Sequence, residues 1–420
     1  MSVYLNNAAT TWPKPPCVAG AVADFITRGG ANLARGTASE RDLTTLSVVM
    51  DCRVFLAGLL GGFENGNPRY VTFCSGVTEA LNVVLKGFLC SGPPSDGALA
   101  SGGVSTSGRA LASGRVLTSN MEHNAVVRPL RGLERRGLRL EFLDCDPDGL
   151  LRPETVAGAL DDEKADLVVL GHASNVCGTI QPLEEIAAVC RKRGVPLVVD
   201  AAQTAGILPI RVAEWGLSAL CFTGHKGLMG PQGVGGIVWN PDFAGRVEPL
   251  VEGGTGSFSH VEVQPSDMPD KFEAGTPNLP GIAGLYAALS WLAETGIENI
   301  ERRERELGQR LLDGLERFGA SSAPRGSTLQ GGRTTMEGRL PVFSLNFRSS
   351  NDGILDNGLL ADRLSREGFE TRPGLHCAPL AHRRLGSFPQ GSLRVSPGYF
   401  NTFEDVDSFM EALEKCTREN

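Results

Sequence analysis

Long apolar runs are missing from this sequence of 420 residues, and their absence excludes several classes of protein. No uncharged stretch reaches the length of about 20 residues that a helix needs to cross a bilayer. The first 15 residues contain neither a basic start nor an apolar segment, so we predict no signal peptide. We therefore expect a soluble protein that has no membrane as a partner.

An excess of basic charge and metal-binding patterns are also missing. The formal net charge of -8 argues against nucleic acid and anionic membranes as partners. The ten cysteines form no CxxC pair, which suits a reducing compartment such as the cytoplasm, with most thiols acting as small core residues. The six histidines show no HExxH or similar spacing, so we expect no metal site.

The order of apolar segments predicts an α/β protein. Short β-rich runs alternate with helical patterns through the first two thirds of the chain, which is typical of a mostly parallel sheet covered on both faces. The expected strands are Arg69–Phe73, Arg115–Ser119, Leu138–Leu143, Asp166–Leu170, Val195–Val199, Leu220–Thr223 and Val234–Trp239. The expected helices between them are Val77–Leu89, Ala125–Arg136 and Leu183–Arg193.

The last third of the chain has a different character, and it predicts a second domain. A chain of this length exceeds one compact core, so we expect a large domain at 16–292 and a small α+β domain formed by 1–15 and 293–420. Its expected helices are Ile282–Glu294 (at the junction), Ile297–Phe318, Gly358–Arg366 and Phe403–Lys415, and its expected strands Pro341–Phe347 and Ser392–Ser396. Two stretches rich in Gly and Ser, 91–114 and 320–339, are expected to be surface loops, with a functional lid as the alternative.

A lysine among glycines is the first candidate for chemistry. Lys226 follows an apolar strand and is trailed by several glycines, so it can reach a crevice where strands end. Lysine is the residue that forms a covalent bond with pyridoxal phosphate (PLP). Taken alone, a surface lysine on a glycine-rich loop is the simpler interpretation.

Asp200 favours a cofactor-binding role for Lys226 over that of a surface lysine. It ends the preceding strand, and Gln203 follows three residues later. A carboxylate at the end of a central strand can pair with a pyridinium nitrogen and keep the ring protonated, although a helix N-cap is an equally common role for a lone aspartate. Two strands that end in Asp200 and Lys226 within about 25 residues favour a PLP site.

Two further segments fit the same site. Small and hydroxyl residues at 74–80 join a strand to a helix, whose N-terminus can hold a phosphate, and a simple capping box is the compatible alternative. His123 closely follows the strand Arg115–Ser119 and could stack on a cofactor ring. A structural role is the alternative for this histidine.

A cluster of residues near the C-terminal end of the sequence contains a candidate nucleophile. Cys377 stands beside His376 and near Arg372, between glycine and proline, in an electropositive turn that favours a thiolate. Its alternative, a buried structural thiol, is what we expect for most of the other nine cysteines. Arg394, on a strand-like segment, could bind a substrate carboxylate in bidentate fashion, with a surface salt bridge as the alternative.

Several motifs in this order resemble those of one enzyme family. They are LNNAATTWPKP, SGVTEALN, MEHNAV, SNVCGT, VVDAAQ, FTGHKGLMGPQGVG, FEAGTPN and RPGLHCAPL. The chain therefore resembles the cysteine desulfurases and selenocysteine lyases, which have the class V aminotransferase fold. The resemblance implies a PLP-dependent transferase of fold type I, with a seven-stranded sheet in the large domain, that acts as a homodimer.

The resemblance also implies a role for each matching residue. Lys226 is similar to the lysine that carries PLP, Asp200 to the partner of the ring nitrogen, and His123 to the stacking histidine. The implied cofactor-binding residues are Gly76, Val77, Thr78, His123, Asn175, Asp200, Gln203, Thr223, His225, Lys226 and Thr276, the last across a dimer interface. The implied substrate-binding residues are Asn175, Arg372 and Arg394, and the implied catalytic residues are Lys226, Cys377 and His123.

The implied reaction converts L-cysteine to L-alanine and leaves a persulfide on Cys377 for a sulfur-acceptor protein, as in iron–sulfur cluster assembly. L-selenocysteine, giving alanine and selenide, is also considered as a substrate. Pro373 and Leu375 stand where relatives usually carry Thr and His, a histidine common in the family is missing near 35–36, and the insertion at 91–114 is unusual. Substrate choice therefore stays open. An aminotransferase, an epimerase or a kynureninase-like hydrolase is the second hypothesis, and a non-catalytic scaffold is the third.

Overall fold

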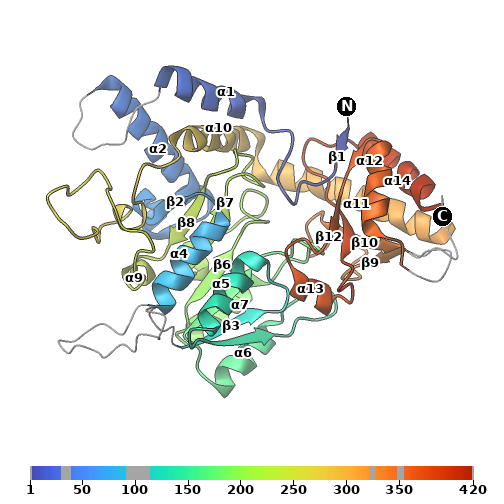
Figure 1. Ribbon diagram of the computed structural model, residues 1–420, viewed down its shortest axis with the longest axis horizontal. Coiled ribbons are helices and arrows are strands. Elements are labelled where there is room, and N and C mark those ends of the chain that lie inside the picture. The colour runs from blue at the N-terminus through green and yellow to red at the C-terminus, as the bar shows by residue number, and fades with distance from the viewer. Residues whose placement is uncertain (1, 30–38, 91–113, 322–326, 348–353, 419–420) are drawn as a thin grey trace.

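A twisted seven-stranded sheet forms the centre of the computed structural model, which describes residues 2–29, 39–90, 114–321, 327–347 and 354–418 (Figure 1). Its strands lie in the order β2 (Val71–Cys74), β8 (Gly235–Trp239), β7 (Ala219–Thr223), β6 (Leu197–Asp200), β5 (Leu167–Gly171), β3 (Arg115–Ser119) and β4 (Arg139–Leu143). Only β8 runs antiparallel to its neighbours in this sheet. The predicted α/β class and mostly parallel sheet are confirmed.

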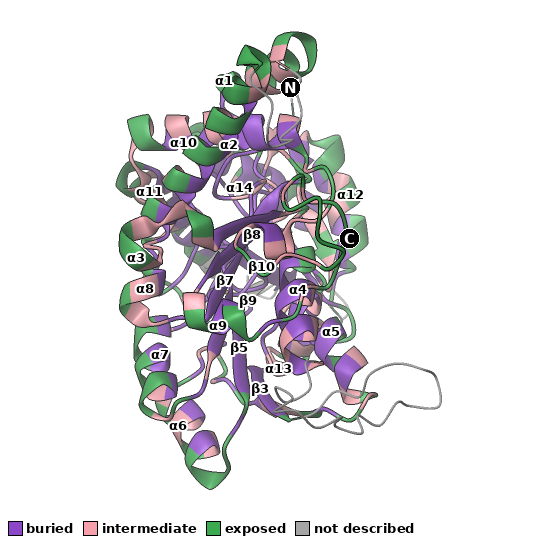
Figure 2. Cartoon of the chain, turned by 90° about the vertical axis from the view of Figure 1, so that its left-hand side faces the viewer, coloured by how far each residue is buried: buried purple, intermediate pink, exposed green. Residues whose placement is uncertain are grey.

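Helices cover both faces of this sheet, as the apolar strands require. One face packs on α4 (Val77–Leu89), α5 (Asn124–Glu134) and α9 (Pro241–Gly245). The other face packs on α2 (Glu40–Leu59), α6 (Pro153–Asp162), α7 (Leu183–Lys192) and α10 (Leu279–Thr295). Figure 2 shows the result, with buried strands inside and helices whose outer sides are exposed.

Smaller elements complete this part of the chain. They are α1 (Pro16–Asp24), α3 (Phe63–Gly66), α8 (Val212–Trp215) and helical turns at Phe25–Gly29, Pro68–Tyr70 and Asp270–Phe272. Helices α1 and α2 both pack against α10, so the N-terminal segment covers the same face as the long helix before the second sheet.

A second, smaller sheet has the order β12 (Arg372–Gly374), β13 (Ser392–Val395), β10 (Phe343–Phe347) and β9 (Ser327–Leu329). Its core is shared with α11 (Ile297–Ser321), α12 (Asn357–Arg366) and α14 (Phe403–Arg418), whereas Ala381 of α13 (Pro379–Arg384) packs in the core of the large sheet. Strand β1 (Val3–Tyr4) pairs in parallel with β11 (Phe369–Glu370), so the first residues join the C-terminal part of the chain. This pairing agrees with the division at 1–15 and 293–420, whose boundaries stay a prediction.

Several sequence predictions need correction. The pattern did not predict α1, α2 or α6, and the apolar residues of the longest of them, α2, form no clear stripe. The loop expected at 320–339 is partly wrong, because α11 continues to Ser321 and β9 pairs with the edge of β10. The loop expected at 91–114 lies almost wholly outside the described residues. Among the described residues, no helix is both long and apolar enough to span a membrane.

Candidate active site

A small cavity lies at the carboxyl ends of the parallel strands, and five residues predicted from the sequence meet there. Its volume is about 40 Å³. His123, Asn175, Asp200, Gln203 and Lys226 all line it. They come from the ends of four strands, β3, β5, β6 and β7, so the topology of the sheet brings them together.

Lys226 is the cation at the centre of this group. Burial lowers the pKa of its amine from 10.5 to about 8, Asp200 opposes this change, and Arg394 and Arg372 reinforce it. A large share of this amine is therefore neutral near pH 8, the form in which nitrogen can attack an aldehyde or accept a proton.

Asp200 is buried at the last position of β6. Its Oδ1 accepts a hydrogen bond of 2.9 Å from the Ala202 amide, so the turn that follows β6 fixes the carboxylate. Burial raises the pKa of Asp200, and the charge of Lys226 counters this. A cationic partner in the cavity would stabilise this carboxylate, and a pyridinium N–H is such a partner.

His123 separates the small cavity from a larger groove, since it lines both. Its Nδ1 accepts a hydrogen bond of 3.0 Å from the Ala125 amide and so caps α5. Burial, reinforced by Lys226, lowers the pKa of His123 to about 4, so the ring is neutral at pH 7. Because Nδ1 is an acceptor, the proton of the neutral ring lies on Nε2. The structural alternative and a role at the cavity are thus both compatible with the geometry.

The N-terminus of α4 has the features of a phosphate site. Gly76 is its N-cap, and no side chain caps the helix. Glu79 accepts instead from the Ser75 amide at 2.6 Å, which is half of the capping box considered from the sequence. A Cβ on Gly76 would lie 3.6 Å from Oγ1 of Thr223, so this predicted pair is adjacent.

The polar groups in and beside the cavity fit PLP. Among the described residues, Nδ1 of His225 is buried without a hydrogen-bond partner. The uncapped start of α4 offers amides to a phosphate, Asp200 offers a carboxylate to a ring nitrogen, and Lys226 offers an amine to an aldehyde. Val77 also lines the cavity, whereas Thr78 lines the neighbouring groove.

Cys377 is exposed on a strained loop after β12. Both His376 and Cys377 have positive φ, at 50° and 58°. For residues other than glycine this backbone is strained, and such strain concentrates at functional sites. The Asn124 amide holds the carbonyl of Cys377 at 2.7 Å, and the Asn175 side chain holds that of His376 at 2.7 Å. Asn175 lines the Lys226 cavity and Asn124 lines the larger groove next to it, so the loop is fixed beside both.

The buried alternative for Cys377 is therefore wrong. Of the other nine cysteines, Cys17 is also exposed, against the expectation that it is a core residue. Cys74 and Cys90 are half-buried, and the remaining six are buried. Cys377 alone among them lines either of the two spaces around His123.

Arg394 is 1% exposed, which excludes the surface salt bridge considered from the sequence. One guanidinium nitrogen donates to the carbonyl of Asn175 at 3.1 Å and another to Oδ1 of Asn6 at 2.9 Å. Its Nε has no partner among the described residues. Arg372 lies opposite Arg394 on the neighbouring strand, so two guanidinium groups share one region. An anion such as a substrate carboxylate would relieve their repulsion.

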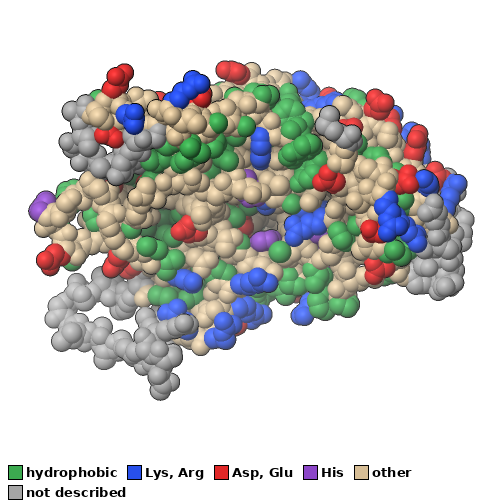
Figure 3. Space-filling model, turned by 45° about the horizontal axis from the view of Figure 1, so that its top comes forward, with side chains coloured by type: hydrophobic (Ala, Val, Ile, Leu, Met, Phe, Trp, Pro, Cys, Tyr) green, Lys and Arg blue, Asp and Glu red, His purple; other side chains and the backbone are tan. Residues whose placement is uncertain are grey.

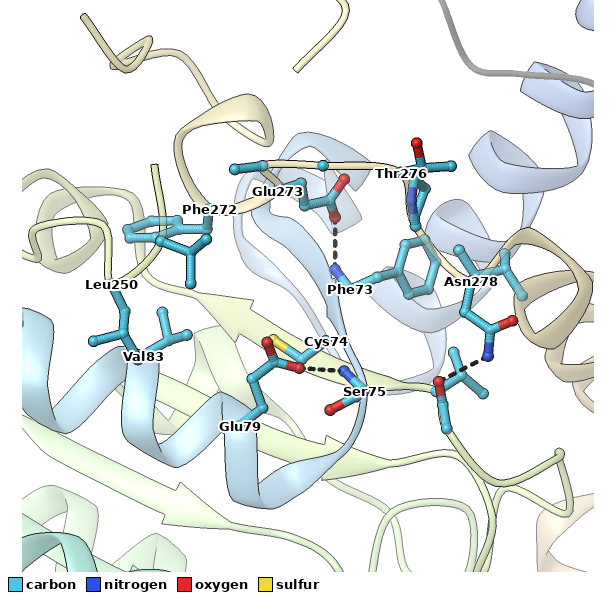
Figure 4. A pocket seen from close by; sticks show the side chains of 17 residues that line it. Phe73, Cys74, Ser75, Glu79, Val83, Leu250, Phe272, Glu273, Thr276 and Asn278 are labelled. Carbon is cyan, nitrogen blue, oxygen red and sulfur yellow. Dashed lines mark hydrogen bonds between the residues drawn. The ribbon is translucent and has the colours of Figure 1, made fainter. Parts of the chain in front are cut away.

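Thr276 is the predicted site residue that the structure places elsewhere. It lies on the rim of an apolar pocket of about 230 Å³, with Phe73, Leu250 and Phe272 (Figure 4). Neither this pocket nor the exposed Thr276 forms part of the Lys226 cavity within one chain. Its implied contact with a phosphate would therefore have to come from another copy of the chain.

Sequence reasoning missed a strap that holds the backbone at Lys226. The carbonyl of His225 accepts from the Lys14 amine at 2.7 Å, from the Thr10 hydroxyl at 3.1 Å and from the Thr11 amide at 3.2 Å. The Thr11 hydroxyl donates to the carbonyl of Lys226 at 3.1 Å. Burial lowers the pKa of Lys14 to about 8. The motif TTWPK was visible in the sequence, but its partner lies more than 200 residues away.

We expect Lys14→Met to reduce turnover about 10-fold, because a hydrogen bond from a charged donor contributes about 1.5–3 kcal/mol. Lys14→Arg should recover most of the loss, since it keeps a cationic donor. The measurement is kcat, alongside the thermal midpoint of the cofactor-loaded protein. A general loss of stability would lower the midpoint as well, and turnover within two-fold of the original protein would exclude the positioning role.

Glu122 is a second residue that sequence reasoning missed. Its carboxyl group is buried in the cavity wall, where it pairs with the Ser119 hydroxyl at 2.6 Å and the Gly171 amide at 2.9 Å. Burial, with the nearby charge of Asp200, raises its pKa from 4.5 to about 8. Glu122 is therefore predominantly neutral at pH 7. Its neighbour His123 drew attention instead, because a carboxylate before a helix is an ordinary capping signal.

The proton on Glu122 predicts how stability changes with pH. Its raised pKa means that the fold keeps a proton that the unfolded chain releases, so this stabilisation is present below 4.5 and is lost as pH rises toward 8. Glu122→Gln, which imitates the neutral acid, should flatten the fall in the urea midpoint between pH 6 and 9. Glu184→Gln, an exposed change on α7, is the control, and parallel curves for all three proteins would contradict the prediction.

Comparisons with known proteins agree with the fold and with the expected family. The model of the Aminotransferase class-V family matches residues 3–409. A probable cysteine desulfurase of Pyrococcus abyssi is 30% identical, over 99% of this chain and 94% of the relative. A cysteine desulfurase of Haloferax volcanii is 28% identical, over 98% of this chain and 88% of the relative.

Solved structures give the same result. The apo cysteine desulfurase of Thermococcus onnurineus superposes with a TM-score of 0.85 at 26% identity, covering 100% of this chain and 95% of that one. The cysteine desulfurase CsdA of Escherichia coli, with an S-sulfonic acid, has a TM-score of 0.81 at 25% identity, covering 99% of this chain and 95% of that one.

Proposed function

The chain belongs to the class-V aminotransferase family of PLP-dependent enzymes, and on that premise we propose that it is a cysteine desulfurase. It converts L-cysteine to L-alanine and stores the sulfur as a persulfide on Cys377. The single observation that carries this proposal is an exposed thiol on a loop that two hydrogen bonds hold beside the Lys226 cavity, one from Asn175 in the cavity wall and one from Asn124 in the neighbouring groove.

PLP, when bound, supplies an aldehyde that bonds to amines and a ring that withdraws electrons from the substrate α-carbon. Lys226 would hold the aldehyde, Asp200 the ring nitrogen and Gln203 the ring hydroxyl. His123 would cover the ring, and the start of α4 with Thr223 and His225 would hold the phosphate. Arg394, Arg372 and Asn175 would orient the substrate carboxylate.

The chain's own groups then move protons and sulfur. The neutral amine of Lys226 takes the proton from the substrate α-carbon. The Cys377 thiolate attacks the substrate sulfur, an S–S bond forms, and the electron pair of the broken C–S bond passes to the β-carbon. Neutral His123, with its proton on Nε2, would act as the acid, because it lines both the cavity and the groove that contains Cys377. With selenocysteine the weaker C–Se bond reduces the need for Cys377.

The homodimer, the sulfur-acceptor protein and the cytoplasmic site of action belong to the same proposal. A homodimer is supported by exposed apolar side chains at 250–263, close to Thr276, which would reach the phosphate of the other copy. A sulfur-acceptor protein is supported by the exposure of Cys377. A cytoplasmic site of action is supported by the need to keep that thiol reduced.

The test is to measure the alanine that forms from L-cysteine, with dithiothreitol as the final sulfur acceptor. The kcat/KM for L-cysteine is then compared with the kcat/KM for L-selenocysteine. Stoichiometric alanine and sulfide are expected. Formation of pyruvate and ammonia, or transfer of the amino group to a keto acid, would instead indicate another reaction of the same family. We retain an aminotransferase, epimerase or kynureninase-like activity as the alternative, because the fold alone does not choose the reaction.

A further inference from the structure

A groove between α4 and α5 extends away from Cys377. Thr78, Asn82 and Lys86 line its α4 side at helical spacing, and Arg128 and Arg135 line its α5 side. Val77 and His123 at the helix starts line the Lys226 cavity, so both N-termini lie at the inner end. The Asn124 amide, which holds Cys377, fixes the thiol at that same end. We call this space the α4–α5 groove.

The charge of the α4–α5 groove is opposite to that of the whole chain. Its described lining contains one lysine and three arginines and no carboxylate, whereas the chain carries -8. Within the described residues, Lys86, Arg128 and Arg135 form no ion pair, although Arg131 on the same helix pairs with Glu134. Figure 3 shows a group of Lys and Arg side chains at the lower edge of the face in view, and others that lie among Asp and Glu over the rest of it. Unneutralised cations around a concave surface attract an anionic ligand.

The size of the groove indicates a peptide rather than an amino acid. Its volume is about 640 Å³, against about 40 Å³ for the cavity at Lys226. Eight residues of helix separate Thr78 from Lys86, a rise of about 12 Å at about 1.5 Å per residue. An extended segment of about four residues covers this length, because each residue spans about 3.3 Å.

We propose that the α4–α5 groove docks an acidic loop of the sulfur-acceptor protein, with the acceptor cysteine at Cys377 and carboxylates about four residues away at Lys86 and Arg135. This inference rests on the proposed function. The acceptor thiolate attacks the outer sulfur of the Cys377 persulfide, a new S–S bond forms, and the old one breaks. Cys377 leaves as a thiolate and takes up the proton that the acceptor thiol lost when it became a thiolate. No external oxidant or reductant is therefore required.

A protein loop is favoured over a nucleic acid because the inner end of the groove is a thiol. The occupant has to bring its own sulfur nucleophile to Cys377, and a cysteine side chain supplies one. The half-buried Lys86 and the exposed Arg135 then recognise charge at a distance from the reacting sulfur.

The experiment uses synthetic nonapeptides with a central cysteine as acceptors for the cofactor-loaded enzyme and L-cysteine. One peptide carries aspartates four residues from the cysteine, and the other carries lysines there. We expect alanine formation with the acidic peptide to have a kcat/KM at least about 10-fold higher at low salt, and the difference to shrink as salt rises. Equal rates with both peptides would overturn the proposal.

Variants separate the groove from the chemistry. The double variant Lys86→Glu with Arg135→Glu should lose the preference for the acidic peptide and keep its dithiothreitol-dependent rate within about two-fold. The control is Lys164→Glu with Lys192→Glu, which changes the net charge equally at exposed sites outside the groove. If the control loses the preference as fully, general charge explains the effect and the proposal is wrong.

Two further outcomes distinguish a failure of the proposed function from a failure of the docking proposal. If the original enzyme forms no alanine with dithiothreitol, the proposed function fails, whatever the peptides do. If a single-stranded RNA oligonucleotide protects Cys377 from alkylation at a lower concentration than the acidic peptide does, the groove is a nucleic-acid site and the docking proposal fails alone.

Discussion

Lys226→Ala is expected to lower alanine formation at least about 1,000-fold, since it removes both the covalent attachment point and the base. The amine is buried, and its pKa of about 8 leaves a large neutral fraction under ordinary assay conditions. The variant should also lose the absorbance that a lysine-bound cofactor gives. Both readouts are measured on protein loaded with equal amounts of PLP.

The control for this prediction is Lys192→Ala, an exposed lysine on α7. It should keep both the absorbance and the rate. If Lys226→Ala retained the lysine-bound absorbance, the cofactor would be attached to another amine, and the half-buried Lys14 of the strap is a candidate. Such a result would contradict the assignment of the whole cavity.

Cys377→Ala is expected to lower sulfur release from L-cysteine at least about 100-fold while the cofactor absorbance stays unchanged. The reason is that Cys377 alone among the described cysteines lines the groove next to His123. Loss of sulfide and alanine together, with cofactor retained, separates this role from that of Lys226. Turnover of selenocysteine should fall less, because the C–Se bond breaks more readily.

Cys17→Ala is the matched control, since Cys17 is the other exposed cysteine of the described chain. It should release sulfur at the rate of the unchanged protein. If Cys377→Ala desulfurated L-cysteine normally, sulfide would leave directly from the substrate, and the strained backbone at His376 and Cys377 would need another explanation.

The central sheet could be predicted from the sequence with small errors at strand ends. Strands β5 and β7 illustrate why, because continuous runs of Leu, Val, Ala, Cys and Phe have few alternatives to a buried parallel strand. Helix α2 escaped prediction because its apolar residues spread around the helix and give no clear stripe. Strand β9 has only three residues, which is too short for a pattern.

The site was predictable where it depends on strand ends. Asp200 and Lys226 follow neighbouring strands, and parallel strands end at one edge of a sheet, so local pattern and topology already join them. Cys377 could be singled out by its neighbours, but its position depends on hydrogen bonds to Asn124 and Asn175 from the other part of the chain. No local pattern contains that information.

By itself, the sequence determined the alternation of strands and helices, and with it the edge at which the Asp200 carboxylate and the Lys226 amine meet. Only the tertiary structure decided the neutral state of Glu122, the strap from Lys14 to the His225 carbonyl, and the basic groove beside Cys377. The physical reason is distance along the chain. The hydrophobic pattern is a property of residues that are close in sequence. Burial, pKa and surface charge instead depend on residues that folding brings together from distant parts of the chain.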